Sequence, residues 1–172
     1  MPNHCFAQPR AQLYSKIMSR AFVKEPDGND AFEDLPEKRV SEHRNLVTPE
    51  GLVMIEAEVT RLQADQVVAQ GANDRAEIAR AARDLRYWAS RRSSAEVQPA
   101  PVNSETVQFG STISLERGDG RRQKFRIVGE DEANPAKGSV SYVSPLAQAL
   151  MGKVVGDVVR IGDGEAELLQ II

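Results

Sequence analysis

Two apolar stripes at helical spacing, separated by a short turn, restrict the fold of this 172-residue chain more than any other feature. Each stripe repeats at intervals of three or four residues, which is the seam of an amphipathic helix. Gly71 and Asn73 lie between the stripes and predict a tight turn. Residues 48–97 are therefore predicted to form an antiparallel helical hairpin. The stripe residues are Leu52, Ile55, Val59 and Leu62 in the first arm, and Ile78, Ala81, Leu85 and Trp88 in the second.

Residues suited to capping stand at the start of each predicted helix. Thr48 is a good N-cap, and Pro49 suits the first helical turn. At the tip of the hairpin, Asp74 and Glu77 have the spacing of a capping box, in which Asp74 accepts from the amide three residues on and Glu77 reaches back. This spacing gives the two tip acids a structural role.

The two arms of the predicted hairpin differ in charge. Residues 50–70 hold four acids and one arginine, whereas residues 73–94 hold six arginines and three acids. The planar guanidinium suits contact with phosphate or carboxylate, so Arg80, Arg83 and Arg86 are candidate contacts to a charged partner, RNA and DNA included. Pairing with the acids of the first arm is the alternative.

The pattern changes to short β-strands and glycine turns after residue 98. Arg117-Gly118-Asp119-Gly120 is a hairpin signal between the first two strands. Residues 144–151 predict a short helix. Residues 98–172 are thus predicted to form a β-rich domain, which makes the whole chain α+β. The predicted strands are Thr106–Glu116, Gln123–Val128, Ser139–Val143, Val158–Ile161 and Glu167–Ile172.

The N-terminal residues 1–47 are predicted to be a disordered tail. They hold seven basic and seven acidic side chains, with no helical or strand period longer than a turn. Met18 opens a stretch that is typical of an ordinary N-terminus. Residues 1–17 are therefore interpreted as an upstream extension of the reading frame.

Composition excludes several kinds of site. Cys5 is the single cysteine, which rules out an internal disulfide and a cysteine-built zinc site and fits the reducing cytoplasm. His4 and His43 lie far apart and outside the predicted helices and strands, so neither a hydrolytic triad nor metal-ligand spacing is present. Because no run of 18 apolar residues occurs, no membrane span is predicted. We expect a cytoplasmic monomer that is not an enzyme and has no cofactor, metal or catalytic site.

Glu130-Asp131-Glu132 is an acidic cluster in the β-rich domain. Carboxylates of this kind can hold a divalent cation. Three consecutive side chains cannot all point at one ion without an unusual loop, so an exposed acidic loop is the preferred interpretation.

Several phrases resemble the GreA/GreB family of bacterial transcription elongation factors. They are Phe109-Gly110-Ser111-Thr112, Phe125-Arg126-Ile127-Val128-Gly129-Glu130-Asp131-Glu132-Ala133, Ser144-Pro145-Leu146-Ala147, Gly152-Lys153 and Gly156-Asp157. Thr48-Pro49-Glu50-Gly51 also looks like the opening of the family's N-terminal coiled coil, and Leu85-Arg86-Tyr87-Trp88 looks like its returning arm. The similarity covers residues 48–172.

This resemblance implies an FKBP-like C-terminal domain that binds RNA polymerase beside its secondary channel, and a hairpin that enters the channel. It implies that Glu130, Asp131, Ser144, Pro145 and Leu146 are polymerase-binding residues. The family's hairpin tip carries an acidic phrase whose side chains hold a catalytic magnesium with the polymerase. The tip here, with Asp74 and Glu77, does not contain that phrase, and the hairpin is shorter by about 20 residues, or ~15 Å of reach.

The resemblance therefore predicts a regulator of elongation that binds polymerase without stimulating transcript cleavage. A short-arm relative resembling the regulator of nucleoside diphosphate kinase is the alternative within transcription. Peptidyl-prolyl isomerase activity, a different class of function, is suggested by the FKBP-like fold alone, and fold analogy is weak evidence for activity.

Overall fold

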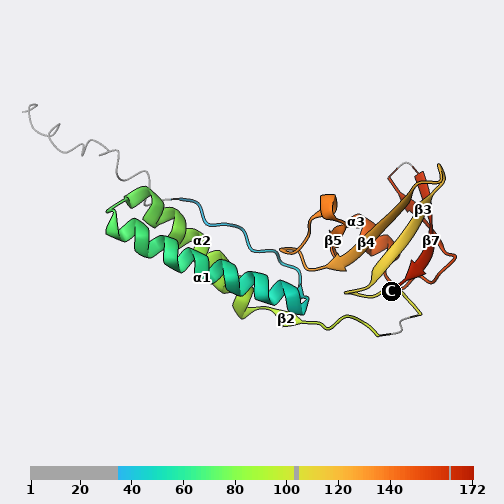
Figure 1. Cartoon of the computed structure of the whole chain (residues 1–172), viewed down its shortest axis with the longest axis horizontal. Helices are drawn as coiled ribbons and strands as arrows, with labels where there is room; N and C mark the ends of the chain where they lie inside the picture. The colour runs from blue at the N-terminus through green and yellow to red at the C-terminus, as the bar shows by residue number, and fades with distance from the viewer. Residues whose placement is uncertain (1–34, 103–104, 163) are drawn as a thin grey trace, which may run out of the picture.

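The computed structural model describes residues 35–102, 105–162 and 164–172. It is elongated, with a helical hairpin at one end and a β-rich domain at the other (Figure 1). The hairpin consists of α1 (Pro49–Gly71) and α2 (Arg75–Ser93). The predicted α+β class and the predicted hairpin are both confirmed.

The caps and stripes predicted from the sequence explain where α1 and α2 begin and how they pack. The Thr48 hydroxyl accepts a hydrogen bond from the Gly51 amide at 3.0 Å, and Asp74 Oδ1 accepts from the Glu77 amide at 3.1 Å. Asn73 turns the chain at a φ of 54°, in the left-handed region that Asn tolerates better than most residues. Ile55, Val59, Leu62 and Ala69 of α1 are buried, together with Ala81 of α2.

One half of the predicted capping box is wrong. Glu77 does not reach back to the amide of Asp74, which instead donates to the Ala69 carbonyl at 3.0 Å. The Glu77 carboxylate pairs with Arg80 one turn further along α2. The Asp74 amide already has its hydrogen bond within the tight turn. The Glu77 side chain therefore pairs with Arg80, three residues further along the helix.

Residues 35–47, which we call the strap, run beside the hairpin toward its base (Figure 1, blue). Glu37 accepts from Arg86 Nε at 3.0 Å, and Lys38 Nζ lies 3.0 Å from Asp84. The strap ends in β1 (Leu46–Val47), which pairs in parallel with β2 (Glu96–Val97) after α2. The structure thus places residues 35–47 against α2, which corrects the disordered tail predicted for this part of residues 1–47. The sequence pattern did not indicate this, because the partners in these ion pairs and backbone hydrogen bonds lie far away in the sequence. Residues 1–34 lie outside the described residues.

The C-terminal domain is a five-stranded sheet with one helix on its inner face. Strand order is β5-β4-β3-β7-β6, antiparallel except for the β4–β5 pair. The strands are β3 (Thr112–Arg117), β4 (Arg122–Val128), β5 (Ser139–Ser141), β6 (Val158–Ile161) and β7 (Gly164–Ile171). A 3-10 turn, Pro135–Lys137, precedes β5, and α3 (Pro145–Leu150) follows it.

The core of this domain lies between the sheet and α3. Alternate residues of the central strands point inward, and Ile113, Leu115, Ile127 and Leu168 have no exposed surface. Ala147 and Leu150 of α3 are equally buried and close the core from the other side.

Two predicted strands are longer than the observed ones. β3 begins at Thr112 and not at Thr106, because Gly110 turns the chain at a φ of 87° just before it. β5 ends at Ser141, because the next residues form the turn that leads into α3. Within the described ranges, no helix has the length and apolar character to cross a membrane.

Candidate functional site

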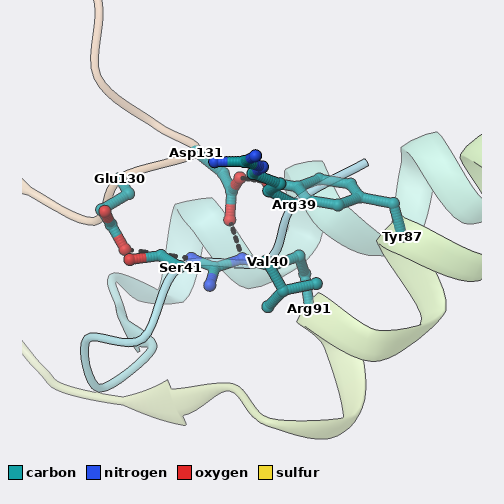
Figure 2. Close-up of a pocket in the computed structure, with 7 residues that line it drawn as sticks. All are labelled: Arg39, Val40, Ser41, Tyr87, Arg91, Glu130 and Asp131. Carbon is teal, nitrogen blue, oxygen red and sulfur yellow. Dashed lines mark hydrogen bonds and ion pairs between the residues drawn. The ribbon is translucent and has the colours of Figure 1, made fainter. Parts of the chain in front are cut away.

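The acidic loop Glu130–Glu132 lies where the hairpin meets the C-terminal domain, and its carboxylates contact both arms. Figure 2 shows the loop facing the Arg91 side chain of α2, with Tyr87 beside it. A pocket of 310 Å³ lies here between the loop, α2 and the strap residues 39–41. The structure therefore corrects the expectation of an exposed acidic loop.

Asp131 holds the second arm of the hairpin. One of its oxygens accepts from Arg91 Nε at 2.5 Å, and the other accepts from the Tyr87 hydroxyl at 2.8 Å. The side chain of Arg91 is only 2% exposed and that of Asp131 8%, so this ion pair is shielded from water. Burial and the bond to Asp131 raise the pKa of Tyr87 to about 12.

Glu130 contacts the same arginine more loosely. Its Oε2 atom lies 3.7 Å from the Arg91 guanidinium and has no hydrogen-bond partner. Asn45 of the strap donates to the Arg91 backbone carbonyl at 2.6 Å. The end of α2 is thus held by the strap and by the C-terminal domain together.

Glu132 holds the first arm at the start of α1. Its carboxylate accepts from the Thr48 amide at 2.9 Å, from the Thr48 hydroxyl and from the Gly129 amide at 3.2 Å. A carboxylate at a helix N-terminus also interacts favourably with the helix dipole. The approach is so close that a Cβ on Gly51 would lie 2.0 Å from Glu132 Cδ.

Replacing Gly129 by alanine should destabilise the protein by about 1–3 kcal/mol, because the added Cβ would lie 2.5 Å from the Leu46 carbonyl oxygen and the backbone must move. Gly71→Ala is the matched control, since a Cβ there meets nothing within 4 Å. That control should be neutral, or more stable by up to about 1 kcal/mol, because alanine favours the helix. Urea unfolding of the two variants measures the difference, and equal stability would contradict the close packing at Gly129.

The arginines of the basic arm, which are Arg80, Arg83 and Arg86, pair with acids of α2 and of the strap. Arg80 pairs with Glu77, Arg83 with its neighbour Asp84, and Arg86 with Glu37 of the strap. An ion pair also joins the two arms: Arg92 Nε of α2 lies 3.4 Å from the Glu56 carboxylate of α1. The hydrogen bond from Arg86 lowers the pKa of Glu37.

Of the five predicted polymerase-binding residues, Glu130 and Asp131 belong to the acidic loop, whereas Ser144, Pro145 and Leu146 lie at the start of α3. Ser144 caps α3 by accepting from the Ala147 amide at 3.2 Å, Pro145 is exposed, and Leu146 packs against the edge of the core. Exposed apolar side chains follow α3 directly along the chain. They are Met151, Val154, Val155 and Val158.

Comparison with known proteins identifies the family. The model described as "Transcription elongation factor, GreA/GreB, C-term" matches residues 102–171. Transcription elongation factor GreB of Neisseria meningitidis is 32% identical over 155 residues, which cover 76% of this chain and 95% of that protein. The chain belongs to the GreA/GreB family. Members of the GreA/GreB family are transcription elongation factors and not enzymes themselves, so the resemblance and the non-enzymatic expectation are confirmed.

Other GreA/GreB-family proteins match over shorter stretches or at lower identity. Transcription elongation factor GreA of Nautilia profundicola is 50% identical over 66 residues, which cover 38% of this chain and 41% of that protein. The crystal structure of GreA factor homolog 1 of Thermus thermophilus is 25% identical and covers 76% of this chain and 99% of its own, with a TM-score of 0.38.

Sequence reasoning missed the residues that join the two parts of this GreA/GreB-family chain. Tyr87, Arg91, Asn45 and Thr48 act at the junction, yet their partners are 40 or more residues away. Two signals were available in the sequence: three consecutive acids at residues 130–132, and a glycine at position 51. A side chain at position 51 would collide with the carboxylate of Glu132. In the described residues, no group of three His, Cys, Asp or Glu side chains is placed to hold a metal ion.

Proposed function

We propose that this protein binds RNA polymerase at its secondary channel, as a monomer, and regulates elongation without stimulating transcript cleavage. Membership in the GreA/GreB family implies RNA polymerase as the partner. The observation that carries the rest of the proposal is the state of the acids at the hairpin tip.

Both tip acids are committed to local contacts. Asp74 accepts from the backbone at the start of α2, and Glu77 pairs with Arg80. A carboxylate that assists metal-dependent cleavage must point at the ion and its water, with errors of only tenths of an ångström. Asp74, whose carboxylate is bound to the backbone of its own helix, does not meet that requirement, and Glu77 would first have to leave Arg80.

The length of the hairpin supports the same conclusion. The match to GreB of Neisseria meningitidis runs over 155 positions but uses only 76% of this chain, so roughly two dozen positions of the relative have no counterpart here. We assign much of that loss to the hairpin, whose α1 has 23 residues and is about 35 Å long. A shorter hairpin delivers its tip to a shallower place in the channel.

The surface around α3 is suited to docking on a protein. Pro145 is exposed, and Val154 and Val155, which are 43% and 55% exposed, follow on the loop after the helix. Neighbouring exposed apolar residues mark protein interaction sites more often than isolated ones do. We therefore place the polymerase contact at Ser144, Pro145 and Leu146 and extend it to this loop. Glu130 and Asp131 were also predicted to bind polymerase. Because both contact Arg91 of α2, we assign them a role in holding the hairpin to the C-terminal domain instead.

Changing Val154 and Val155 together to serine should weaken binding to core RNA polymerase about tenfold, since two exposed apolar side chains lose their burial in the complex. Val102→Ser is the matched control, an exposed valine on the linker. Binding is measured by fluorescence anisotropy of the labelled protein. If the double variant and the control bind equally, the docking surface lies elsewhere.

The basic arm should add an electrostatic contribution to binding. Arg80 and Arg86 are more than half exposed, and exposed ion pairs are worth only about 0–1 kcal/mol, so they can exchange their internal partners for acidic or phosphate groups in the channel. Replacing Arg80, Arg83 and Arg86 by alanine should weaken polymerase binding and flatten its salt dependence. Arg61→Ala on the acidic arm is the control, and an unchanged salt slope in the triple variant would leave the arm with a purely internal role.

A further inference from the structure

We infer that the loop Gly129–Glu132 is a latch that fixes the direction in which the hairpin leaves the C-terminal domain, with Asp131 as its main positioning residue. Two consecutive carboxylates of one loop hold two different helices: Asp131 binds α2, and Glu132 binds the start of α1. A single attachment would allow the hairpin to pivot around it. Attachments to both arms remove that freedom.

Further contacts close the junction on its remaining sides. Arg126 of β4 lies 3.1 Å from Glu50 in the first turn of α1. The Tyr142 hydroxyl, also from the C-terminal domain, donates to the Arg44 carbonyl of the strap. Asn45, the next strap residue, donates to the Arg91 carbonyl of α2 and to Ser94. The C-terminal domain, the strap and the hairpin therefore form a closed ring of contacts.

The length of the hairpin makes this control of direction matter. An arm of about 35 Å moves its tip by about 6 Å for every 10° of rotation at the base. The Arg91–Asp131 pair is suited to prevent such rotation, because a buried ion pair depends strongly on the relative direction of its two groups. Apolar packing alone is non-directional and would hold the angle less firmly.

The direction of the hairpin can be measured on the free protein by spin-label distances. Ala72→Cys at the tip and Lys124→Cys on β4 carry the labels, in a chain whose single native cysteine, Cys5, is replaced by serine. The parent should give one narrow distance distribution. Asp131→Asn should at least double its width at unchanged helix content by circular dichroism, whereas Asp119→Asn, an acid in a surface turn paired with Arg121, should not broaden it.

A second variant keeps the test decisive if Asp131→Asn fails to fold. Tyr87→Phe removes only the hydroxyl that donates to Asp131, and it should broaden the distribution to a smaller extent. A distribution as narrow as that of the parent in the folded Asp131→Asn protein would overturn the inference, and so would an unchanged Tyr87→Phe protein if that variant alone folds.

The consequence for transcription rests on the proposed function, whereas the distance measurement does not. If the protein enters the secondary channel, the broadened variant should compete less well for polymerase than the parent does. A narrow parent distribution that broadens in the variant, without any polymerase binding by either, would support the latch and reject the proposed function.

Discussion

Added to backtracked elongation complexes with magnesium, the protein should leave the RNA at its original length and should suppress the shortening caused by a GreB-type factor in the same reaction. Asp74 and Glu77 are engaged with α2, so they are not placed to supply the carboxylates that would fix a magnesium ion and its water. Cleavage should be slower by about 100-fold or more than with the GreB-type factor, which corresponds to a loss of about 2.8 kcal/mol in transition-state stabilisation.

The control for this experiment is the double variant Asp74→Asn, Glu77→Gln. Asparagine is as good an N-cap as aspartate, so the helix should remain intact while the carboxylates are lost. The variant should compete as well as the parent. RNA shortening by the parent that disappears in the double variant would make the protein a cleavage factor and would contradict the proposed function.

Removing one partner of the buried ion pair should have the largest effect on stability. Asp131→Ala leaves the Arg91 guanidinium buried beside Glu130, which lies 3.7 Å away and is less well placed, and the free energy of unfolding should fall by about 3 kcal/mol. Combining Asp131→Ala with Arg91→Met should cost less than the sum of the two single changes, because the double variant buries neither the Arg91 guanidinium nor the Asp131 carboxylate without its partner.

Unfolding in urea, followed through Trp88, measures these differences. Trp88 is the single tryptophan and lies in α2 next to Tyr87, so its fluorescence reports on the hairpin. Asp119→Ala breaks an exposed pair with Arg121 and should change stability far less than Asp131→Ala does. Strict additivity of the two single changes would show that Arg91 and Asp131 do not interact energetically.

The hairpin and the sheet could be predicted from the sequence because both repeat a pattern along the chain. Helical spacing from Leu52 to Leu62 marks the face of α1 that is buried, and alternation in β3 and β4 places Ile113 and Ile127 in the core. The strands β1 and β2 have two residues each, which is too short to show any period. They form because the two ends of the hairpin meet at its base, a condition that no local pattern records.

The junction could not be predicted for a related physical reason. A row of acids is normally solvated, and only the positions of Thr48, Tyr87 and Arg91 in space turn residues 130–132 into a set of hydrogen-bond acceptors. The cap at Asp74 was predictable because its partner is three residues away. The partner of Asp131 is 40 residues away, and that separation is a property of the fold.

The strap changes the cross-section of the molecule at the level of Asp84 and Arg86. There Glu37 and Lys38 lie against α2, so three chain segments pass side by side where a plain hairpin has two. Nearer the tip, the described chain consists of the two helices alone. Any opening that admits the hairpin therefore meets a step in its width near the middle of α2. Full insertion requires either a wide entrance or the release of the two ion pairs that hold Glu37 and Lys38 to α2.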